Sequence, residues 1–321
     1  MDQSTTSTCP DPVFSPKKYL IVEKIGKGAF GNVYKVLRKE HGTRKLFALK
    51  KPRGGVETIN YSEVEAMKLL KHEENFVKFI EVIKHGDQFG VVMELCRADL
   101  RKVLFYKNIE FDMSHIKNML KQLFTGLAAM HRKRIMHRDL KADNILISNE
   151  GVIKIGDLGS SVVIESQACF SANVCTLWYR SPELLFGSRK YDEKVDMWSS
   201  GLISIEFFTR EPGLFRGDDD TDQMKKISEI CGFCSEHIWS EAKEFPFYKE
   251  YHKKFANYKN NTLEIYLKEI IHCPSATEFI AEQLQLVPDR RMTAENALRH
   301  NFLTSGDEPA VDLQYILQQL K

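Results

Sequence analysis

Hydrophobic and polar residues alternate along the first part of the chain. The alternation is clearest at residues 19–25, 32–38 and 45–51, and glycine or charged turn residues bound each run. Because successive side chains of a strand face opposite sides of a sheet, this period of two predicts antiparallel strands. Two further strand-like runs at residues 76–83 and 89–95 complete a predicted sheet of five strands.

A helical period replaces the alternation elsewhere. Residues 59–70 place several apolar side chains on one face, with Glu63 in the middle of that face. Beyond the sheet the period is mostly helical, and residues 114–134 carry a long apolar stripe. Short strands at residues 144–148 and 152–156 form a predicted hairpin. The predicted fold class is therefore α+β, with a small five-stranded antiparallel β lobe that carries one helix and a larger, mainly helical lobe.

The two ends of the chain differ from its middle. Residues 1–18 begin with a stretch rich in Ser, Thr, Pro and Asp, which predicts a disordered leader. Residues 304–321 form a tail that begins with turn residues and ends in a short amphipathic helix. Four apolar side chains share one face of that helix: Leu313, Ile316, Leu317 and Leu320. We expect this face to dock on the same chain, and a surface for a partner is the alternative.

The composition limits the possible functions. The 321 residues include 46 Lys and Arg against 44 Asp and Glu, which leaves a net charge of +2. So balanced a charge does not favour attraction to nucleic acid or membranes, and we expect neither as a direct partner. The apolar runs are too short to span a bilayer and the polar N-terminus lacks a signal-peptide core, so we expect an intracellular protein.

Seven cysteines are scattered along the chain. An odd, scattered set in a chain of this length indicates reduced thiols rather than a disulfide framework. Cys231 and Cys234 form a CxxC motif, but no second pair follows at the spacing of a zinc finger. We interpret this pair as core packing, with metal binding as the weaker alternative.

A glycine-rich stretch joins the first two predicted strands, with Gly26, Gly28, Gly31 and Val33 in GxGxxGxV spacing. Glycines let the backbone approach a phosphate, and the amides between them can donate to it. In a dinucleotide-binding fold such glycines lead into a helix, but here they lead into a strand. We predict a loop that covers nucleotide phosphates. Its candidate nucleotide-binding residues are Ile25, Gly26, Lys27, Gly28, Ala29, Phe30, Gly31, Asn32 and Val33.

Lys50 lies in the third predicted strand, nineteen residues after Gly31. Taken alone, it could be an ordinary solvated strand lysine. Glu63, however, lies on a core-facing stripe, and an unpaired buried carboxylate is costly. We therefore predict that Glu63 pairs with Lys50.

The stretch HRDLKADN at residues 137–144 brings an acid, a cation and an amide together, and Asp157 follows eighteen residues after Asp139. Phosphoryl transfer needs a hydroxyl placed in line with the phosphate and a neutralised negative charge. Asp139 could accept the hydroxyl proton, and Lys141 could lie beside the transferred group. Asn144 and Asp157 offer the hard oxygen ligands that magnesium prefers.

These motifs resemble, in order and spacing, the catalytic domain of eukaryotic protein kinases. The resemblance covers residues 19–303 and also rests on DLG at 157–159, SPE at 181–183, Asp196 in DMWSSG and Arg291 in PDRRMT. It implies a bilobal kinase fold with an N-lobe at 19–95 and a C-lobe at 96–303. It also implies a serine/threonine kinase that uses ATP and Mg²⁺.

The resemblance assigns roles to further residues. Lys50, held by Glu63, would grip the phosphates of ATP. The backbone at Glu94 and Cys96 would bind adenine, and Asp99 would face the ribose. By the same resemblance, Arg291 would pair with Glu183. Residues 137–144 would form the catalytic loop, and Asp196 would support the backbone of that loop.

The stretch TLWYRSPELL at residues 176–185 resembles the proline-directed cyclin-dependent kinases, most closely the transcription-elongation type that phosphorylates the RNA polymerase II tail. The resemblance implies protein substrates with Ser/Thr-Pro sites and a possible cyclin partner. By the resemblance, the activation segment would run from Asp157 to Glu183, and the candidate regulatory residues are Arg138, Ser171, Thr176 and Arg180. Arg180 would engage this segment so that proline is favoured after the target residue. Between nuclear and cytoplasmic locations, the resemblance alone favours the nucleus.

Several positions depart from that family. In the helix that would face a cyclin the chain has ETINYSE at residues 57–63. Ser171, five residues before Thr176, lies where the activating phosphothreonine usually is; of the three arginines that would hold its phosphate, Arg138 remains, while Ser62 and Val162 replace the others. Each lost bidentate pair removes about 1.5–3 kcal/mol. We expect phosphorylation of Ser171 to organise the segment less strongly than in relatives.

Two alternative functions remain. The first is a catalytically weak, kinase-like scaffold that binds a cyclin-like partner, which Leu158 in place of phenylalanine and the missing arginines favour. The second is a kinase of small molecules, which the SPE segment and the long insert at residues 235–275 disfavour. Ala29 and Phe30 replace the Thr and Tyr that inhibitory kinases modify in cell-cycle members, so we expect that brake to be absent.

Overall fold

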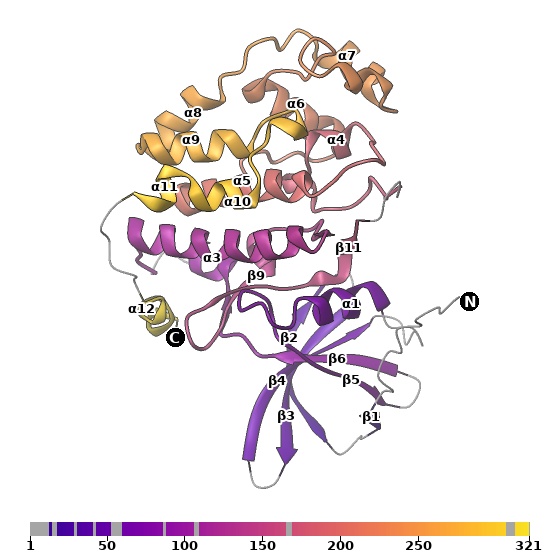
Figure 1. Ribbon diagram of the computed structural model, residues 1–321, viewed down its shortest axis with the longest axis vertical. Coiled ribbons are helices and arrows are strands. Elements are labelled where there is room, and N and C mark those ends of the chain that lie inside the picture. Colours follow the sequence, from indigo (N-terminus) through magenta and orange to yellow (C-terminus); the bar gives the residue numbers. More distant parts are fainter. Residues whose placement is uncertain are drawn as a thin grey trace, which may run out of the picture. The chain divides into compact units, whose positions relative to one another are not determined.

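The computed structural model of the chain describes residues 13–14, 18–28, 31–40, 43–52, 60–85, 88–105, 109–164, 169–305 and 312–320. The chain divides into two compact units. The β unit comprises residues 1–68 and 77–95, and the helical unit comprises residues 69–76 and 96–321. Figure 1 labels the elements of both units.

The β unit is built on one sheet with the strand order β1-β5-β6-β4-β3-β2. The five predicted antiparallel strands are confirmed: β2 (Tyr19–Lys27), β3 (Gly31–Glu40), β4 (Thr43–Pro52), β5 (Phe79–His85) and β6 (Gln88–Glu94). A sixth strand, β1 (Val13–Phe14), pairs in parallel with β5 and falls within the segment expected to be a disordered leader. That expectation is wrong for these two residues, because they pair with the otherwise open edge of β5.

One face of this sheet carries a compact apolar cluster. Its buried members are Val36, Phe47, Leu49, Ile83 and Val92. Helix α1 (Tyr61–Leu69) begins at Asn60, whose side chain accepts a hydrogen bond from the Glu63 N–H at 3.2 Å. Asparagine is a favoured N-cap, so the local sequence defines this start. Residue 59, where the sequence predicted the start, lies outside the described residues.

Residues 69–76 belong to the helical unit, although the sequence suggested a continuous N-lobe up to residue 95. The Asn75 carbonyl accepts from the Ile155 N–H at 2.8 Å, and the Asn75 amide donates to the Ile153 carbonyl at 3.0 Å. Phe76 forms an isolated parallel bridge with Ile155. These backbone pairings hold the turn after α1 on a strand that lies far away in the sequence.

The helical unit contains short strands and many helices. Its strands are β7 (Ala98–Asp99), β8 (Ile135–Met136), β9 (Ile145–Ile147), β10 (Ile153–Ile155) and β11 (Val162–Val163). Its helices are α2 (Leu100–Phe105), α3 (Met113–Arg132), α4 (Pro182–Leu185), α5 (Lys194–Thr209), α6 (Asp220–Cys231), α7 (Tyr248–Phe255), α8 (Leu263–Ile271), α9 (Pro274–Gln283), α10 (Ala294–Arg299), α11 (Asn301–Thr304) and α12 (Gln314–Gln319).

Two long helices form the framework of this unit. The predicted stripe of α3 is buried from Ile116 to Leu127, and α10 and α11 pack beside α3 (Figure 1). Helix α5 is buried along nearly its whole length and contacts α8 and α9. Because α5 is buried on all its faces, it occupies the centre of the unit.

The β9–β10 hairpin forms as the sequence predicted. Ile145 is paired with Ile155, and Gly151 takes the left-handed conformation, φ +80°, in the turn. An added Cβ on Gly151 would lie 3.2 Å from the Gln314 N atom, so glycine is required both by the turn and by its neighbour. The strands therefore meet with the start of β9 beside the end of β10.

The C-terminal helix α12 packs on the helical unit. Leu313, Ile316 and Leu317 are at most 6% exposed. The Gln319 side chain bonds both the N–H and the carbonyl of Glu110, at 2.8 and 3.0 Å. The apolar face that the sequence indicated thus docks on the same chain, close to α3 (Figure 1).

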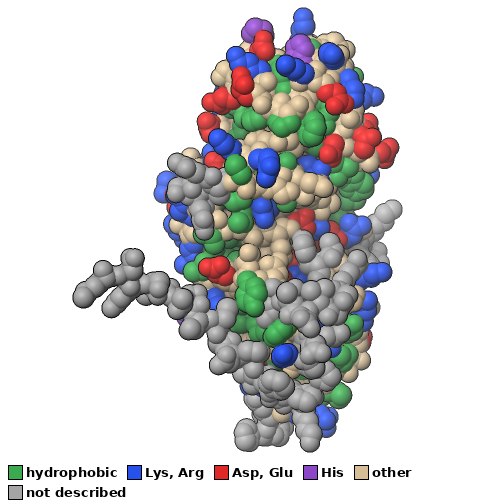
Figure 2. Space-filling view, turned by 90° about the vertical axis from the view of Figure 1, so that its right-hand side faces the viewer, with side chains coloured by type: hydrophobic (Ala, Val, Ile, Leu, Met, Phe, Trp, Pro, Cys, Tyr) green, Lys and Arg blue, Asp and Glu red, His purple; other side chains and the backbone are tan. Residues whose placement is uncertain are grey.

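The charges on the surface bear on the predicted partners, and the acidity of two cysteines bears on the alternative of metal binding. On the face drawn in Figure 2, basic and acidic side chains are interspersed over the helical unit. No helix among the described residues has the length and apolar character needed to cross a bilayer. Burial raises the pKa of the Cys231 and Cys234 thiols to about 12, which disfavours the thiolate form that binds metals.

Candidate active site

The glycine loop lies between β2 and β3 of the β unit. Gly26 pairs with Val33 and Lys27 with Asn32, while the Gly28 N–H donates to the Gly31 carbonyl at 2.8 Å. A Cβ on Gly31 would lie 2.1 Å from the Lys51 carbonyl oxygen, so only glycine fits there. Ala29 and Phe30, also predicted to bind nucleotide, lie outside the described residues.

Ile25, at the end of the same strand, is 45% exposed. An exposed aliphatic side chain next to the glycine loop is available to cover an apolar ligand group. Val33, across the sheet from Gly26, is half-buried and is the neighbour of Lys50 on β4. The sheet register therefore brings the glycine loop and Lys50 together within one unit.

Lys50 and Glu63 form the ion pair that the sequence predicted. The Lys50 Nζ lies 2.5 Å from Glu63 Oε1, and both side chains are nearly fully buried. The pair joins strand β4 to helix α1 within the β unit. Because the glutamate compensates its charge, the ammonium of Lys50 can be held in this buried setting.

The carboxylate of Asp139 is the centre of the catalytic loop in the helical unit. Its Oδ1 accepts from the Thr176 N–H at 2.9 Å and from the Thr176 hydroxyl at 2.8 Å. Its Oδ2 accepts from Lys141 Nζ at 2.8 Å. Three donor atoms of the loop and the activation segment thus fix the orientation of a group that could accept a hydroxyl proton.

Thr176 joins the catalytic loop, whereas the sequence had suggested only a regulatory role. Its hydroxyl also accepts a hydrogen bond from Lys141 Nζ at 2.8 Å. Threonine therefore links Asp139 and Lys141 into a closed triangle of hydrogen bonds. The activation segment and the catalytic loop are ordered together, because the bonds cross between them.

Asp196, at the start of α5, supports the backbone of this loop. Its carboxylate accepts from the N–H groups of His137 and Arg138 at 2.8 and 2.9 Å and lies 3.1 Å from His131 Nε2. Burial alone would raise the pKa of Asp196, but the bonds from His131 and His137 outweigh it and lower that pKa. The anion holds Arg138 in the left-handed conformation, φ +64°, which non-glycine residues rarely adopt.

The His137 side chain contributes a second support. Its Nε2 lies 2.9 Å from the Gly156 carbonyl, and its Nδ1 accepts from the Asp139 N–H at 3.2 Å. These roles require the neutral ring with its proton on Nε2. The imidazole therefore ties the residue before Asp157 to the backbone of Asp139.

Asn144 and Asp157 lie at the same end of the β9–β10 hairpin. The Gly156 N–H donates to the Asn144 carbonyl at 2.9 Å, which places the two residues on adjacent backbone. The Asn144 Nδ2 donates to the Asp139 carbonyl at 2.8 Å, so its Oδ1 faces away from that bond. One amide oxygen and one carboxylate from neighbouring backbone fit the hard-oxygen preference of Mg²⁺.

Glu94, Cys96 and Asp99 are the residues predicted to contact adenosine. In the β unit, the Glu94 N–H donates to the Lys78 carbonyl at 3.0 Å. In the helical unit, Asp99 accepts from the Lys102 N–H at 2.8 Å and so caps α2. Cys96 is half-buried.

The activation segment is held by Arg180. Its guanidinium donates to the carbonyls of Val174 and Cys175 at 3.0 Å and to Asp220 Oδ1 at 2.6 Å. Cys175 has φ +67°, so the arginine holds a strained backbone. Ser171, the expected phosphorylation site, is exposed, and its Oγ accepts from the Asn173 N–H at 3.2 Å.

The end of the activation segment is anchored by Glu183 and Arg291. Two parallel hydrogen bonds of 2.6 and 2.7 Å join them, and both side chains are at most 2% exposed.

Leu158, in the place of the expected phenylalanine, is 4% exposed. The smaller side chain thus still fills an apolar space.

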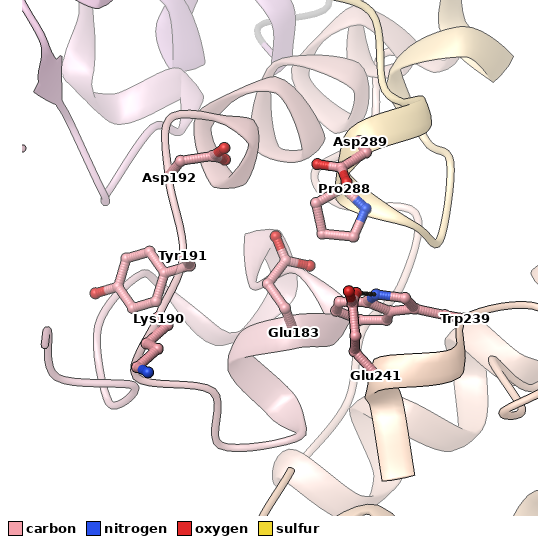
Figure 3. A pocket seen from close by; sticks show the side chains of 8 residues that line it. All are labelled: Glu183, Lys190, Tyr191, Asp192, Trp239, Glu241, Pro288 and Asp289. Carbon is pink, nitrogen blue, oxygen red and sulfur yellow. Dashed lines mark hydrogen bonds between the residues drawn. The ribbon is translucent and has the colours of Figure 1, made fainter. Parts of the chain in front are cut away.

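A hollow of about 280 Å³ lies in the helical unit (Figure 3). Its lining is Glu183, Lys190, Tyr191, Asp192, Trp239, Glu241, Pro288 and Asp289. Three of its carboxylates have partners: Glu183 binds Arg291, Glu241 accepts from the Trp239 N–H, and Asp192 accepts from the Lys194 N–H. The hollow therefore offers few unsatisfied groups to a ligand.

Three contacts near the site had no signal in the sequence. Tyr191 lies between Arg138 and Ser171, His131 supports Asp196, and Tyr179 donates to Glu206. Each contact joins residues that are far apart in the sequence. Only folding brings them to the site.

Comparison with known proteins gives consistent results. The family model described as "Protein kinase domain" matches residues 19–303. The chain is 34% identical over 321 residues to "Cyclin-dependent kinase 9" of Danio rerio, with 94% of this chain and 84% of the relative covered. It is also 34% identical over 317 residues to "CTD kinase subunit alpha" of Schizosaccharomyces pombe, where the match covers 96% of this chain and 52% of the relative.

Solved structures agree with these relatives. The yeast RNA Pol II CTD kinase CTDK-1 complex contains a chain similar at a TM-score of 0.82 and 27% identity, with 95% of this chain and 98% of that chain covered. A chain of the CAK complex from Chaetomium thermophilum bound to ATP-gamma-S matches at a TM-score of 0.78 and 24% identity, with 92% and 94% covered. The second similarity concerns the fold alone.

Proposed function

Because the chain belongs to the protein kinase family and is a serine/threonine kinase of the cyclin-dependent type, we propose that it transfers the γ-phosphoryl group of ATP to Ser or Thr followed by Pro. One observation carries the proposal: Asp139, Lys141 and Thr176 form a closed hydrogen-bonded triangle, with Asn144 bonded to the same aspartate. That arrangement fits the demands of phosphoryl transfer, which are positioning and charge neutralisation.

Each polar residue has a role in this proposal. Asp139 orients the attacking hydroxyl and accepts its proton, and Lys141 neutralises charge on the transferred group. Lys50, oriented by Glu63, binds phosphate oxygens. Asn144 and Asp157 would hold Mg²⁺, which supplies positive charge against the phosphates when bound.

The surroundings of Arg180 support a preference for proline. The Cys175 carbonyl already accepts from Arg180 Nη2, so a substrate N–H facing it would lose this acceptor. Proline has no N–H and carries no such penalty. An unsatisfied N–H costs roughly 1–3 kcal/mol, so we expect about tenfold selectivity or more for Ser-Pro over Ser-Ala.

The relatives suggest the substrate and partner. One relative is named "CTD kinase subunit alpha", and one solved structure is described as an RNA Pol II CTD kinase complex. We propose the RNA polymerase II C-terminal repeats as substrate, a cyclin as partner and the nucleus as location. Tyr61 on α1 is 63% exposed and offers an apolar contact for such a partner.

The test is phosphate transfer from labelled ATP to a Ser-Pro heptad peptide and to its Ser-Ala counterpart, with and without candidate cyclins. Asp139→Asn should lower kcat by about 10³-fold, within the range of general-base removal. The matched control is Asp143→Asn, because Asp143 is half-exposed and lies 3.8 Å from Arg101. It should stay within about threefold of the wild type, as surface substitutions usually do.

A scaffold that binds nucleotide without transfer is the second candidate function. Leu158 and the reduced arginine set at the activation segment favour it. ATP binding with no transfer to any peptide, with or without a cyclin, would support the scaffold and contradict the kinase proposal.

A further inference from the structure

We propose that Tyr191, together with Phe170, positions residues 169–176 of the activation segment, as a phosphate on Ser171 would do in related kinases. The enzyme would then not require phosphorylation of Ser171. Tyr191 is a positioning residue, because it acts on the catalytic loop through Arg138. This inference rests on the proposed kinase function.

The Tyr191 hydroxyl bridges the two elements that a phosphate would join. It donates to the Ser171 carbonyl at 2.6 Å and accepts from Arg138 Nη1 at 3.2 Å. Arg138 also donates from Nε to the Ser160 carbonyl at 2.7 Å, near the start of the activation segment. The arginine that precedes Asp139 is thus linked to Ser160, near the start of the segment, and through Tyr191 to Ser171 in its middle, in both cases by neutral groups.

The hydroxyl can act as this donor at all physiological pH values. Burial is the main cause that raises the pKa of Tyr191 above its usual value. The ring of Tyr191 lines the hollow in Figure 3, while its hydroxyl points away from it. The side chain therefore presents its ring to one neighbour and its donor to the activation segment.

Phe170 supplies the apolar part of this anchor. It is 8% exposed, although it is next to the exposed Ser171, and its ring lies 5.4 Å from the ring of Tyr191. The Arg138 guanidinium lies 5.8 Å from the Phe170 ring, within reach of a cation–π contact. The backbone N–H of Phe170 also donates to the Arg189 carbonyl at 2.8 Å. The residue before Ser171 is therefore fixed without any charge on Ser171.

The cluster around Phe170 includes both ends of the activation segment. Its buried members are Met136, Phe170, Leu184 and Val195, and Val162, Ile164, Val174, Cys175 and Tyr191 pack against them. Val162 occupies a position where the related kinases have a phosphate-binding arginine. Here Val162 packs in an apolar cluster. This position therefore contributes apolar packing to the segment and no positive charge that could bind a phosphate.

The experiment compares full-length Ser171→Ala, Tyr191→Phe and Tyr258→Phe, each confirmed as unphosphorylated by mass spectrometry. Tyr258 is the matched control, because its hydroxyl makes only a 3.4 Å contact with exposed Glu229. Hydrogen exchange is measured for residues 169–176, together with kcat and KM for the heptad peptide and for ATP.

We expect Ser171→Ala to exchange and to transfer phosphate like the wild type. Tyr191→Phe should accelerate exchange at residues 169–176 and lower kcat/KM for peptide about tenfold, since it loses a bridging hydroxyl. The KM for ATP should be unchanged, which a general loss of folding would not give. Tyr258→Phe should match the wild type.

Two results would overturn the proposal. One is activity that appears only after Ser171 is phosphorylated, and the other is a Tyr191→Phe variant whose exchange at residues 169–176 equals that of the wild type. If no variant transfers phosphate, the proposed kinase function fails, but hydrogen exchange still decides whether Tyr191 holds the segment.

Discussion

The two ends of helix α5 carry two buried carboxylates whose acidities move in opposite directions. Asp196, at the start of the helix, is 1% exposed and has a lowered pKa. Glu206, near the end of the same helix, is 0% exposed, and burial raises its pKa to about 7. Burial alone therefore does not decide the charge of an acid in this protein.

The difference lies in the donors that each carboxylate meets. Asp196 accepts from two backbone N–H groups and contacts His131. Glu206 accepts from the Tyr179 hydroxyl and the Gly213 N–H on one oxygen, and its Oε2 has no hydrogen-bond partner among the described residues. Donors on both oxygens and a nearby histidine stabilise the anion, whereas one satisfied oxygen does not offset burial.

The first prediction removes the charge of the strongly bonded acid. Asp196→Asn replaces one acceptor oxygen with a donor that faces backbone N–H groups, so it should cost about 3 kcal/mol of stability. It should also lower kcat about 100-fold, because the catalytic loop shifts. Chemical unfolding and peptide phosphorylation measure both effects.

Asp192→Asn is the control for that prediction. Asp192 precedes the same helix and accepts only from the Lys194 N–H, and burial raises its pKa. It should cost less than about 0.5 kcal/mol, because the asparagine Oδ1 can still accept this capping bond, and leave kcat unchanged. Equal effects at both positions would show that α5 capping, rather than support of the catalytic loop, explains Asp196.

The dependence of stability on acid pH is a second test of the role of Asp196. Because its pKa is lowered in the folded state, its stabilisation is present above the unfolded value of about 4 and is lost as the pH falls through the folded value. Wild-type stability should therefore decline below about pH 4 more steeply than that of Asp196→Asn. Parallel acid-unfolding curves would contradict this reading.

The next prediction concerns Glu206. Its folded pKa of about 7 lies above the unfolded value, so the native state binds more protons between about pH 4.3 and 7. Stability should fall as the pH rises through this window, by an amount on the order of 3 kcal/mol. Glu206→Gln should flatten that dependence, which urea unfolding at several pH values would measure.

Tyr179→Phe also tests the comparison of Asp196 with Glu206, and the expected loss of stability is smaller. Loss of the phenol removes the donor that stabilises ionised Glu206, so the pKa of Glu206 should rise further. The variant should lose about 1–2 kcal/mol above pH 7 and less near pH 5. An equal loss at both pH values would mean that the tyrosine acts only through packing.

The smallest effect is expected from His131→Gln. Glutamine keeps an N–H donor for Asp196, so the cost should be about 0.5–1 kcal/mol. His131→Leu removes the donor and should cost about 1.5–3 kcal/mol, as for a bond to a charged group. Thermal unfolding of the pair measures whether the donor or the ring volume matters.

Much of the fold could be predicted from local patterns. The five strands, the Lys50–Glu63 pair and the β9–β10 hairpin follow from alternation, stripes and turn residues. β1 could not be predicted, because two residues in a polar leader carry no period. The turn after α1 was assigned to the wrong unit because its pairing with β10 spans about 80 residues of sequence.

The sequence by itself determined the fold class and the family and indicated the aspartate, lysine and asparagine proposed for catalysis, because residue type and short spacing encode them directly. The tertiary structure alone joined Thr176 to Asp139 across 37 residues, set opposite pKa shifts on the two acids of α5, and brought Tyr191 to Arg138. Those features depend on which distant groups become neighbours in a water-excluded interior. That placement is decided by packing of the whole chain rather than by any one segment of it.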